Sequence, residues 1–96
     1  MRPSEALNAN RASIRQLALR HGVDNVLLVG SALHATDTGA SDLDLLVDPS
    51  PRTTLMDIAA LRIDVESLLG VRVDILTPRS LPIGFREQVL REAIAV

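Results

Sequence analysis

Several residue types are absent from this 96-residue chain or rare in it. Cysteine is absent, which excludes a disulfide framework and thiolate chemistry. Lysine, tryptophan and tyrosine are absent too, and Phe85 is the single aromatic residue, so any core must be aliphatic. There is no run of 18 apolar residues and no signal-peptide pattern. We therefore expect a cytoplasmic protein that makes no contact with membranes.

Net charge is also small, at −2, and arginine supplies all ten basic residues. A dedicated nucleic-acid binder is usually basic, so the composition disfavours direct nucleic-acid binding. The length predicts a single domain over residues 1–96, with little room for a separate substrate domain. The 47% of hydrophobic residues is enough to form a core.

Hydrophobic periodicity and turn residues predict seven elements. Ser4 is the expected cap of the first helix, Thr53 or Thr54 caps the long central one, and Gly70 ends it. In the last helix, Phe85, Val89, Leu90 and Ile94 are expected to pack inward. The apolar positions of the central helix are Leu55, Ile58, Ala59, Leu61, Val65, Leu68 and Leu69. The elements are a helix over 5–21, a strand over 25–29, one or two helical turns over 31–35, a strand over 43–47, a helix reaching 69, a strand over 71–76 and a helix over 85–94.

The connections between strands indicate the fold class. A long helix joins strands 43–47 and 71–76, which predicts a parallel pair with a right-handed crossover. A short connection without a long helix joins strands 25–29 and 43–47, so these two strands can pair antiparallel. The expected fold class is α/β (α+β), a small mixed β-sheet with flanking helices.

The strand over 43–47 carries acidic side chains. Since side chains alternate across a strand, Asp42, Asp44 and Leu46 share one face. Two carboxylates at i and i+2 are roughly 6.5–7 Å apart along the strand, and their oxygens can converge on cations. All-oxygen ligands suit Mg²⁺ or Mn²⁺. By itself such a pair is usually a solvated strand end or a helix cap.

Two further features favour a functional site. Gly30 and Ser31 follow a buried strand, where glycine lets the backbone approach a phosphate and free N–H groups and the Ser31 hydroxyl can hold its oxygens. Asp74, two residues before Leu76, repeats the spacing of Asp44 and Leu46, and would stand beside the acidic pair if the strands are parallel neighbours. The alternatives are a common turn for Gly30–Ser31 and a strand-end carboxylate paired with an arginine for Asp74.

The combination of Gly30–Ser31, ten intervening residues and Asp42–Leu43–Asp44 resembles the signature of the polymerase-β-like nucleotidyltransferase superfamily. The string GSALHATDTGASDLDLLVD is similar to its minimal branch, the MNT proteins, commonly antitoxins paired with HEPN-domain toxins. The resemblance runs from about Val26 through the final helix. VRVDIL falls where that family places its third acid, which maps to Asp74.

The resemblance implies roles for individual residues. Asp42 and Asp44 would bind two Mg²⁺ ions, with Mn²⁺ as an alternative, and Asp74 would complete the site of the ion that activates the attacking hydroxyl. Gly30 and Ser31 would hold the β- and γ-phosphates of the nucleotide. These assignments make the three aspartates the expected catalytic and metal-binding residues.

Among other positions near the motif, some match the family pattern and some depart from it. Ser41 matches the usual Ser-Asp-x-Asp and is expected to support the turn rather than to react. Minimal members often read Gly-Ser-x-Ala-Arg-Gly, whereas His34 and Ala35 stand here in place of the arginine and the second glycine. His34 could still donate to a phosphate, with less charge at pH 7, or could be a surface histidine.

The resemblance implies transfer of AMP from ATP to a hydroxyl of a partner, a tyrosine on a HEPN RNase toxin, within a hetero-complex. Three alternatives remain open at this point. The chain could be a non-catalytic antitoxin that acts by binding alone, it could transfer a nucleotide to a small molecule, or it could be a purely structural αβ domain. Exposed aliphatic positions, for instance on the last helix, could form the contact with the partner.

Overall fold

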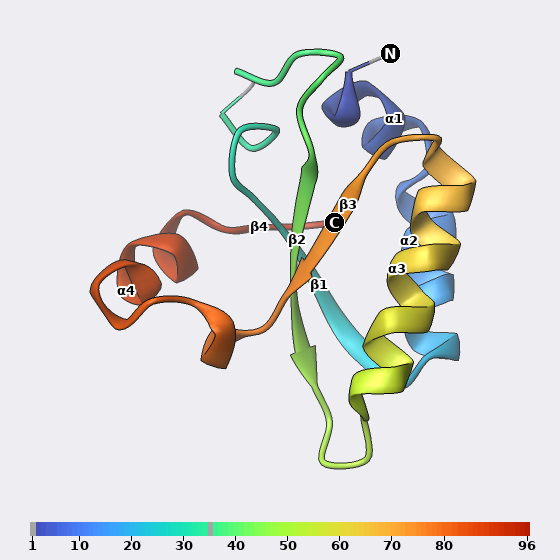
Figure 1. The fold of residues 1–96 in the computed structure, drawn as a ribbon, viewed down its shortest axis with the longest axis vertical. Helices are drawn as coiled ribbons and strands as arrows, with labels where there is room; N and C mark the ends of the chain where they lie inside the picture. Colours follow the sequence, from blue (N-terminus) through green and yellow to red (C-terminus); the bar gives the residue numbers. More distant parts are fainter. Residues whose placement is uncertain (1, 35) are drawn as a thin grey trace.

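The computed structural model describes residues 2–34 and 36–96. Four strands form one mixed sheet in the order β3-β2-β1-β4 (Figure 1). The elements are α1 (Pro3–Ala9), α2 (Arg11–Arg20), β1 (Val23–Val29), β2 (Leu43–Pro49), α3 (Leu55–Leu69), β3 (Val73–Leu76), the 3₁₀ turn η1 (Pro78–Ser80), α4 (Ile83–Glu92) and β4 (Ile94–Ala95).

The predicted strand pairings are confirmed. β1 and β2 are antiparallel, with Leu28 opposite Leu45. β2 and β3 are parallel, with Leu45 opposite Ile75, and α3 makes the crossover between them. β4 adds to the free edge of β1 and was not predicted, because the C-terminal residues have a helical pattern.

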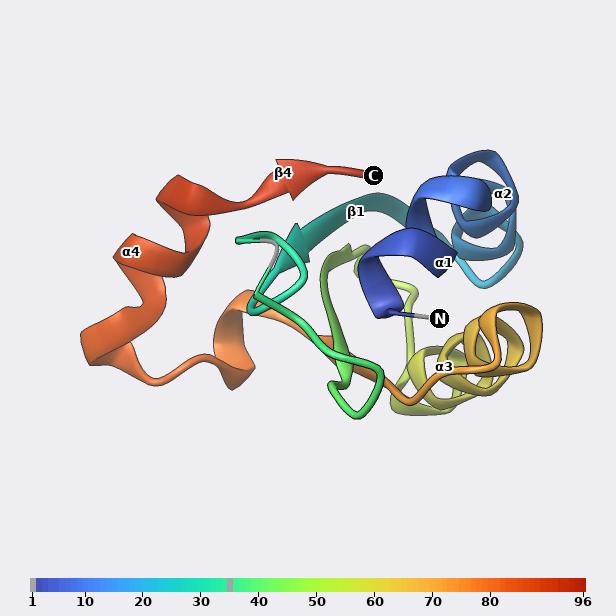
Figure 2. The same ribbon diagram turned by 90° about the horizontal axis from the view of Figure 1, so that it is seen from above.

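The two faces of the sheet differ. Helices α1, α2 and α3 cover one face, while α4 stands beside the other (Figures 1 and 2). The main core lies under the three helices and includes Leu7, Ile14, Leu43, Leu61 and Val65, each almost fully buried. We call the opposite face, to which residues 27, 29, 44, 46, 74 and 76 project, the open face. A second, smaller cluster of apolar residues lies there, around Val29, Leu46 and Leu81.

The N-terminal helix differs from the prediction. It begins at Pro3, with Arg2 rather than Ser4 at the N-cap, and it breaks at Asn10 into α1 and α2. The Asn10 side chain donates to the Ala6 carbonyl at 2.9 Å. This local bond competes with helix continuation and ends α1 there. The helical spacing of apolar residues continues across the break, so the pattern concealed it.

The central helix has the predicted ends. The Thr54 hydroxyl accepts a hydrogen bond from the Asp57 amide at 3.1 Å, and Gly70 closes α3 with a left-handed φ of 68°. Leu61 and Val65 face the core as expected, but Leu55 is 84% exposed. Leu55 is the first residue of the helix and points away from the sheet, which the periodicity could not show.

The C-terminal helix lies two residues earlier than predicted, and three of its four predicted inward residues are exposed. It spans Ile83–Glu92, and Ile94 belongs to β4. Phe85, Leu90 and Ile94 are 62%, 42% and 54% exposed rather than packed inward, while Val89 contacts the second cluster. The backbone turns extended at Ala93, and the Val96 amide then donates to the Val26 carbonyl at 3.0 Å. No helix within the described ranges is long and apolar enough to cross a bilayer.

Candidate active site

The acidic residues gather on the open face of the sheet. Asp44 is directly opposite Asp74 in the parallel ladder and opposite Val29 in the antiparallel one. Opposed residues in a ladder project to the same face, so the Asp44 and Asp74 side chains are neighbours. Asp42, two residues before Asp44, is half-buried at the start of β2. The prediction that Asp74 stands beside the pair is thereby confirmed in position.

Two hydrogen bonds fix the register that brings these acids together. The Leu43 amide donates to the Arg72 carbonyl at 2.8 Å, where β2 and β3 begin. On the other side of β3, the Val73 amide donates to the Glu66 carboxylate at 3.0 Å. Glu66 belongs to α3, so the crossover helix itself holds the beginning of β3 and determines where Asp74 lies.

The surroundings of Asp44 disfavour its charged form. Partial burial raises the pKa of Asp44, and the negative charges of Asp74 and then Asp42 raise it further. Arg72 supplies some compensation, since its Nε lies 3.6 Å from an Asp42 oxygen, but Arg72 is 85% exposed. An exposed pair of this kind contributes little. The site therefore favours binding of additional positive charge beside Asp44.

Gly30 lies against the same carboxylate. Its φ is 80°, and a Cβ placed there would stand 2.5 Å from Asp44 Oδ2 and 3.3 Å from Asp44 Cγ. Any side chain at position 30 would thus push Asp44 out of place. The turn predicted to hold phosphate and the strand predicted to hold metal are in direct contact, which the linear spacing alone could not establish.

Gly30→Ala is expected to lower the stability of the fold by about 1–3 kcal/mol, the usual strain of a non-glycine residue at positive φ. It should also weaken binding of Mn²⁺, because the new methyl group displaces the Asp44 carboxylate. Urea unfolding and a Mn²⁺ titration measure the two effects. Gly70→Ala is the matched control: φ is 68° there, but nothing lies within 4 Å, so stability should fall while Mn²⁺ affinity stays unchanged. Equal Mn²⁺ affinity in both variants would contradict the expectation.

A buried aspartate holds the loop between β1 and β2. Asp37 is 4% exposed and accepts hydrogen bonds from the Ser4 amide at 2.8 Å and the Ser4 hydroxyl at 3.0 Å. The bond from the Ser4 amide is the main reason that the pKa of Asp37 lies below its usual value. Asp37 thus caps α1 from 33 residues away. Sequence reasoning missed it, because an aspartate in a small polar loop gives no local signal of a distant helix end.

Local hydrogen bonds shape both ends of this loop. The Ser41 hydroxyl accepts from the Thr38 amide at 2.9 Å, consistent with the expected turn-supporting role. The Leu33 amide donates to the Gly30 carbonyl at 3.1 Å, and the Thr36 amide donates to the Ser31 carbonyl at 3.1 Å. Residues 31–34 form turns rather than the predicted helical segment.

His34 projects toward the last helix. Its Nε2 lies 3.3 Å from Glu92 Oε2, and both side chains are about half exposed. A phosphate would therefore compete with Glu92 for this imidazole. The assignment of His34 to nucleotide binding stays a prediction, and Ala35, the other departure from the family motif, lies outside the described residues.

The donor chemistry fits a divalent cation. Asp42, Asp44 and Asp74 offer only oxygen ligands, and Asp44 carries an uncompensated charge. Within residues 2–34 and 36–96, no group of three or more histidine, cysteine, aspartate or glutamate side chains is arranged so that it could hold a metal ion by itself. The oxygens of a bound triphosphate beside Gly30 would complete the ligand set that the carboxylates begin.

The chain matches known proteins over most of its length. Residues 13–96 match the family described as polymerase beta, nucleotidyltransferase. The protein adenylyltransferase MntA of Thermococcus cleftensis is 34% identical over 90 residues, which make up 94% of this chain and 88% of the relative.

Solved structures agree on the fold. One, provisionally assigned as a minimal nucleotidyltransferase, is 46% identical, with a TM-score of 0.87 over 97% of this chain and 95% of that chain. Another, of a tri-AMPylated Shewanella oneidensis HEPN toxin in complex with an MNT antitoxin, gives a TM-score of 0.67 at 20% identity, over 92% of this chain and 69% of that chain, a likeness of fold alone. From the family match and the Thermococcus relative, the chain belongs to the polymerase beta nucleotidyltransferase family.

Proposed function

We propose that this protein is a single-domain antitoxin that transfers AMP from ATP to a tyrosine hydroxyl of a partner HEPN toxin and thereby silences it. The observation that carries the proposal is the contact of Gly30 with Asp44, which is opposite Asp74 in the β2–β3 ladder and follows Asp42 by two residues. Two comparisons support a toxin protein as the acceptor: the Thermococcus relative is a protein adenylyltransferase, and the toxin in the Shewanella complex carries AMP. The choice of tyrosine comes from the family resemblance.

The reaction breaks a phosphoanhydride bond of ATP and forms a phosphoester bond to the acceptor. The acceptor oxygen forms a bond to the α-phosphorus, the bond from that phosphorus to the bridging oxygen breaks, pyrophosphate leaves, and the hydroxyl proton passes to water. Asp42 and Asp44, with Asp74, would hold two Mg²⁺ ions, which when bound neutralise charge on the attacking and leaving oxygens.

The other residues position the substrate. Gly30 and Ser31 would receive the β- and γ-phosphates on backbone N–H groups and a hydroxyl. Asp37 keeps the loop that carries them attached to α1, which limits the reorganisation that phosphate binding requires. The rate would come mainly from this positioning and from charge neutralisation.

The acceptor must come from outside the chain, because the chain contains no tyrosine. This gives a clean assay. The protein is incubated with ATP, Mg²⁺ and the HEPN-like product of a neighbouring gene, and the toxin is analysed by intact mass and peptide sequencing. The expected result is one or more added AMP groups on toxin tyrosine and loss of RNase activity. An unmodified toxin under these conditions would refute transfer to it.

The double variant Asp42→Ala with Asp44→Ala separates catalysis from binding. If the protein works by AMP transfer, this variant should still associate with the toxin but should leave its mass and its RNase activity unchanged. Neutralisation by the double variant would instead identify an antitoxin that acts by binding alone. Modification of a small molecule, with none on the toxin, would identify the third alternative.

A further inference from the structure

Three cross-strand pairs follow one another along the open face of the β1–β2 ladder, and their polarity changes from pair to pair. Val29 is opposite Asp44, Leu27 is opposite Leu46, and Asn25 is opposite Asp48. Moving away from the acids, the strip therefore changes from acidic to apolar and then to a polar amide and carboxylate. Each step is two residues, so Leu46 lies about 7 Å and Asp48 about 13 Å from Asp44 along the strand.

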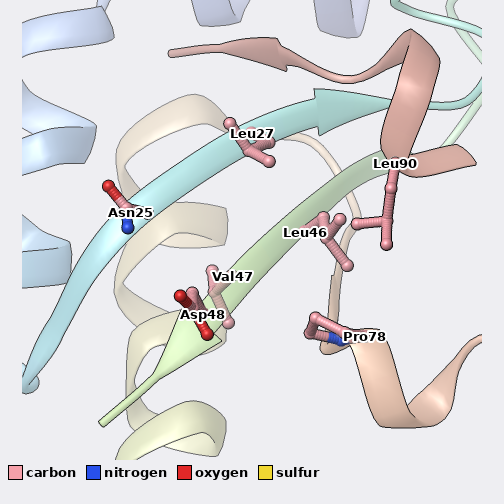
Figure 3. A pocket seen from close by; sticks show the side chains of 7 residues that line it. All are labelled: Asn25, Leu27, Leu46, Val47, Asp48, Pro78 and Leu90. Atoms are coloured by element: carbon pink, nitrogen blue, oxygen red, sulfur yellow. The ribbon is translucent and has the colours of Figure 1, made fainter.

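The far part of this strip is hollowed. A groove of about 330 Å³ is lined by Leu27, Leu46, Leu90 and Pro78, with Asn25 and Asp48 at one end. In Figure 3 the Leu90 side chain extends from α4 toward Leu46, Pro78 lies below Leu90, and Asn25 and Asp48 lie on the neighbouring strands β1 and β2 at the other end. The volume is within the range of small-molecule sites, and the lining is mostly apolar with a few polar groups, as such sites require.

The position of the groove relates it to the reaction. Gly30, at the end of β1, marks the phosphate end of the strip, and the groove continues along the same strands in the opposite direction. If the α-phosphate is at Asp44 and the outer phosphates are at Gly30, a nucleoside directed away from the turn would pass the Leu27–Leu46 pair, and its base would reach the groove.

The polar end of the groove suits adenine. The Asn25 amide can accept from one adenine amine hydrogen and donate to the adjacent ring nitrogen N7, the geometry by which asparagine reads this base. The Asp48 carboxylate, which accepts only, can take the second amine hydrogen. The leucines and Pro78 would enclose the ring without aromatic stacking, consistent with a chain whose one aromatic residue, Phe85, does not line the groove.

We propose that the groove between β1, β2, Pro78 and Leu90 binds the adenine base of the substrate nucleotide, with Asn25 and Asp48 as the residues that select it. The proposal rests on the proposed function for the position of the phosphates. It assigns base specificity to the end of the strip farthest from the metal-binding acids.

Nucleotide binding, measured without any transfer reaction, tests whether the groove binds adenine. The dissociation constants of ATP, GTP, purine riboside triphosphate (which lacks the amine) and inorganic tripolyphosphate are measured with the full chain by calorimetry, without a toxin partner. The wild-type protein should prefer ATP to purine riboside triphosphate by about tenfold, the effect of a hydrogen bond to a charged group. Asp48→Ala and Asn25→Ala should each remove most of this preference and leave tripolyphosphate binding unchanged. Asp24→Ala, an exposed acid one position away on β1 and outside the groove, should behave as wild type.

Each contrary outcome is distinct. An unchanged preference in the Asp48 and Asn25 variants, or a wild-type protein that binds ATP no better than tripolyphosphate, overturns the assignment even if AMP transfer is observed. A preference for GTP that Asp48→Ala removes keeps the groove as the base site but overturns adenine. Loss of toxin binding in these variants with unchanged base preference would make the groove a protein contact instead. Selective ATP binding with no toxin modification supports the groove while refuting the proposed transfer.

Discussion

Asp44→Asn is expected to reduce nucleotidyl transfer by about 100- to 1,000-fold or more, the loss seen when a single electrostatic stabiliser is removed from an active site. The same substitution should make the fold more stable at neutral pH. Asp44 is partly buried beside Asp74 and Asp42, and these surroundings raise its pKa. An uncharged amide of the same size removes the repulsion and the cost of burying the charge. A residue that lowers stability at neutral pH would thus be one on which transfer depends.

The pH dependence of stability follows from the direction of that shift. Asp44 binds its proton more tightly in the folded state than in the unfolded state. Its contribution is therefore most favourable below the ordinary aspartate pKa and is lost as the pH rises through the raised pKa of the folded state. The stabilisation produced by Asp44→Asn should accordingly be small in acid and should grow toward neutral pH.

Urea unfolding at several pH values, with and without Mg²⁺, measures this prediction. Mg²⁺ should raise the stability of the wild-type protein, since a ligand that binds only the folded state stabilises it, and should have much less effect on Asp44→Asn. Asp24→Asn removes an exposed charge from the neighbouring strand and serves as the control. A variant less stable than wild type at neutral pH, or equally stabilised by Mg²⁺, would show that Asp44 has a structural role rather than a ligand role.

Much of the site could be predicted from the sequence, because its residues obey strand geometry. The alternation of side chains placed Asp44 and Leu46 on one face, and the long crossover placed Asp74 beside them; both are confirmed in the ladder. These inferences need only the period of a strand and the hand of a connection. The direct contact between Gly30 and Asp44 was not predictable, because it depends on how the turn folds back over the sheet.

The parts that were predicted wrongly depend on distant contacts. Ser4 was expected to cap its own helix, but it donates to Asp37, a residue in a loop with no pattern of its own. The last helix has an apolar periodicity, yet Ile94 leaves the helix because β1 offers a free edge that the C-terminal residues fill as a strand, and Phe85 is exposed on α4. Hydrophobic spacing shows which residues can share a face, but not which face the rest of the fold leaves uncovered.

Leu43→Ala is expected to have the largest effect on stability among the substitutions considered. Leu43 separates Asp42 from Asp44, is 0% exposed, and packs in the main core beneath the helices. Truncation of a buried leucine costs about 2–5 kcal/mol, through lost burial and the cavity that remains. A domain of this length has roughly 5–14 kcal/mol in total, so a large share would be lost. The backbone on both sides of the substitution carries the acids, and transfer should therefore fall as well.

Leu55→Ala is the matched control for this substitution. Both residues are leucines at apolar positions of their elements, but Leu55 is 84% exposed at the beginning of α3. Its truncation should change stability by no more than about 0.5 kcal/mol, as for other surface positions. Thermal and urea unfolding of the two variants should separate clearly. If both variants lose several kcal/mol of stability, Leu55 is covered in solution. If neither variant loses stability, the sheet does not pack on α3 through Leu43. If Leu43→Ala alone is destabilised, the anchor that positions the two metal-binding carboxylates is the buried side chain between them.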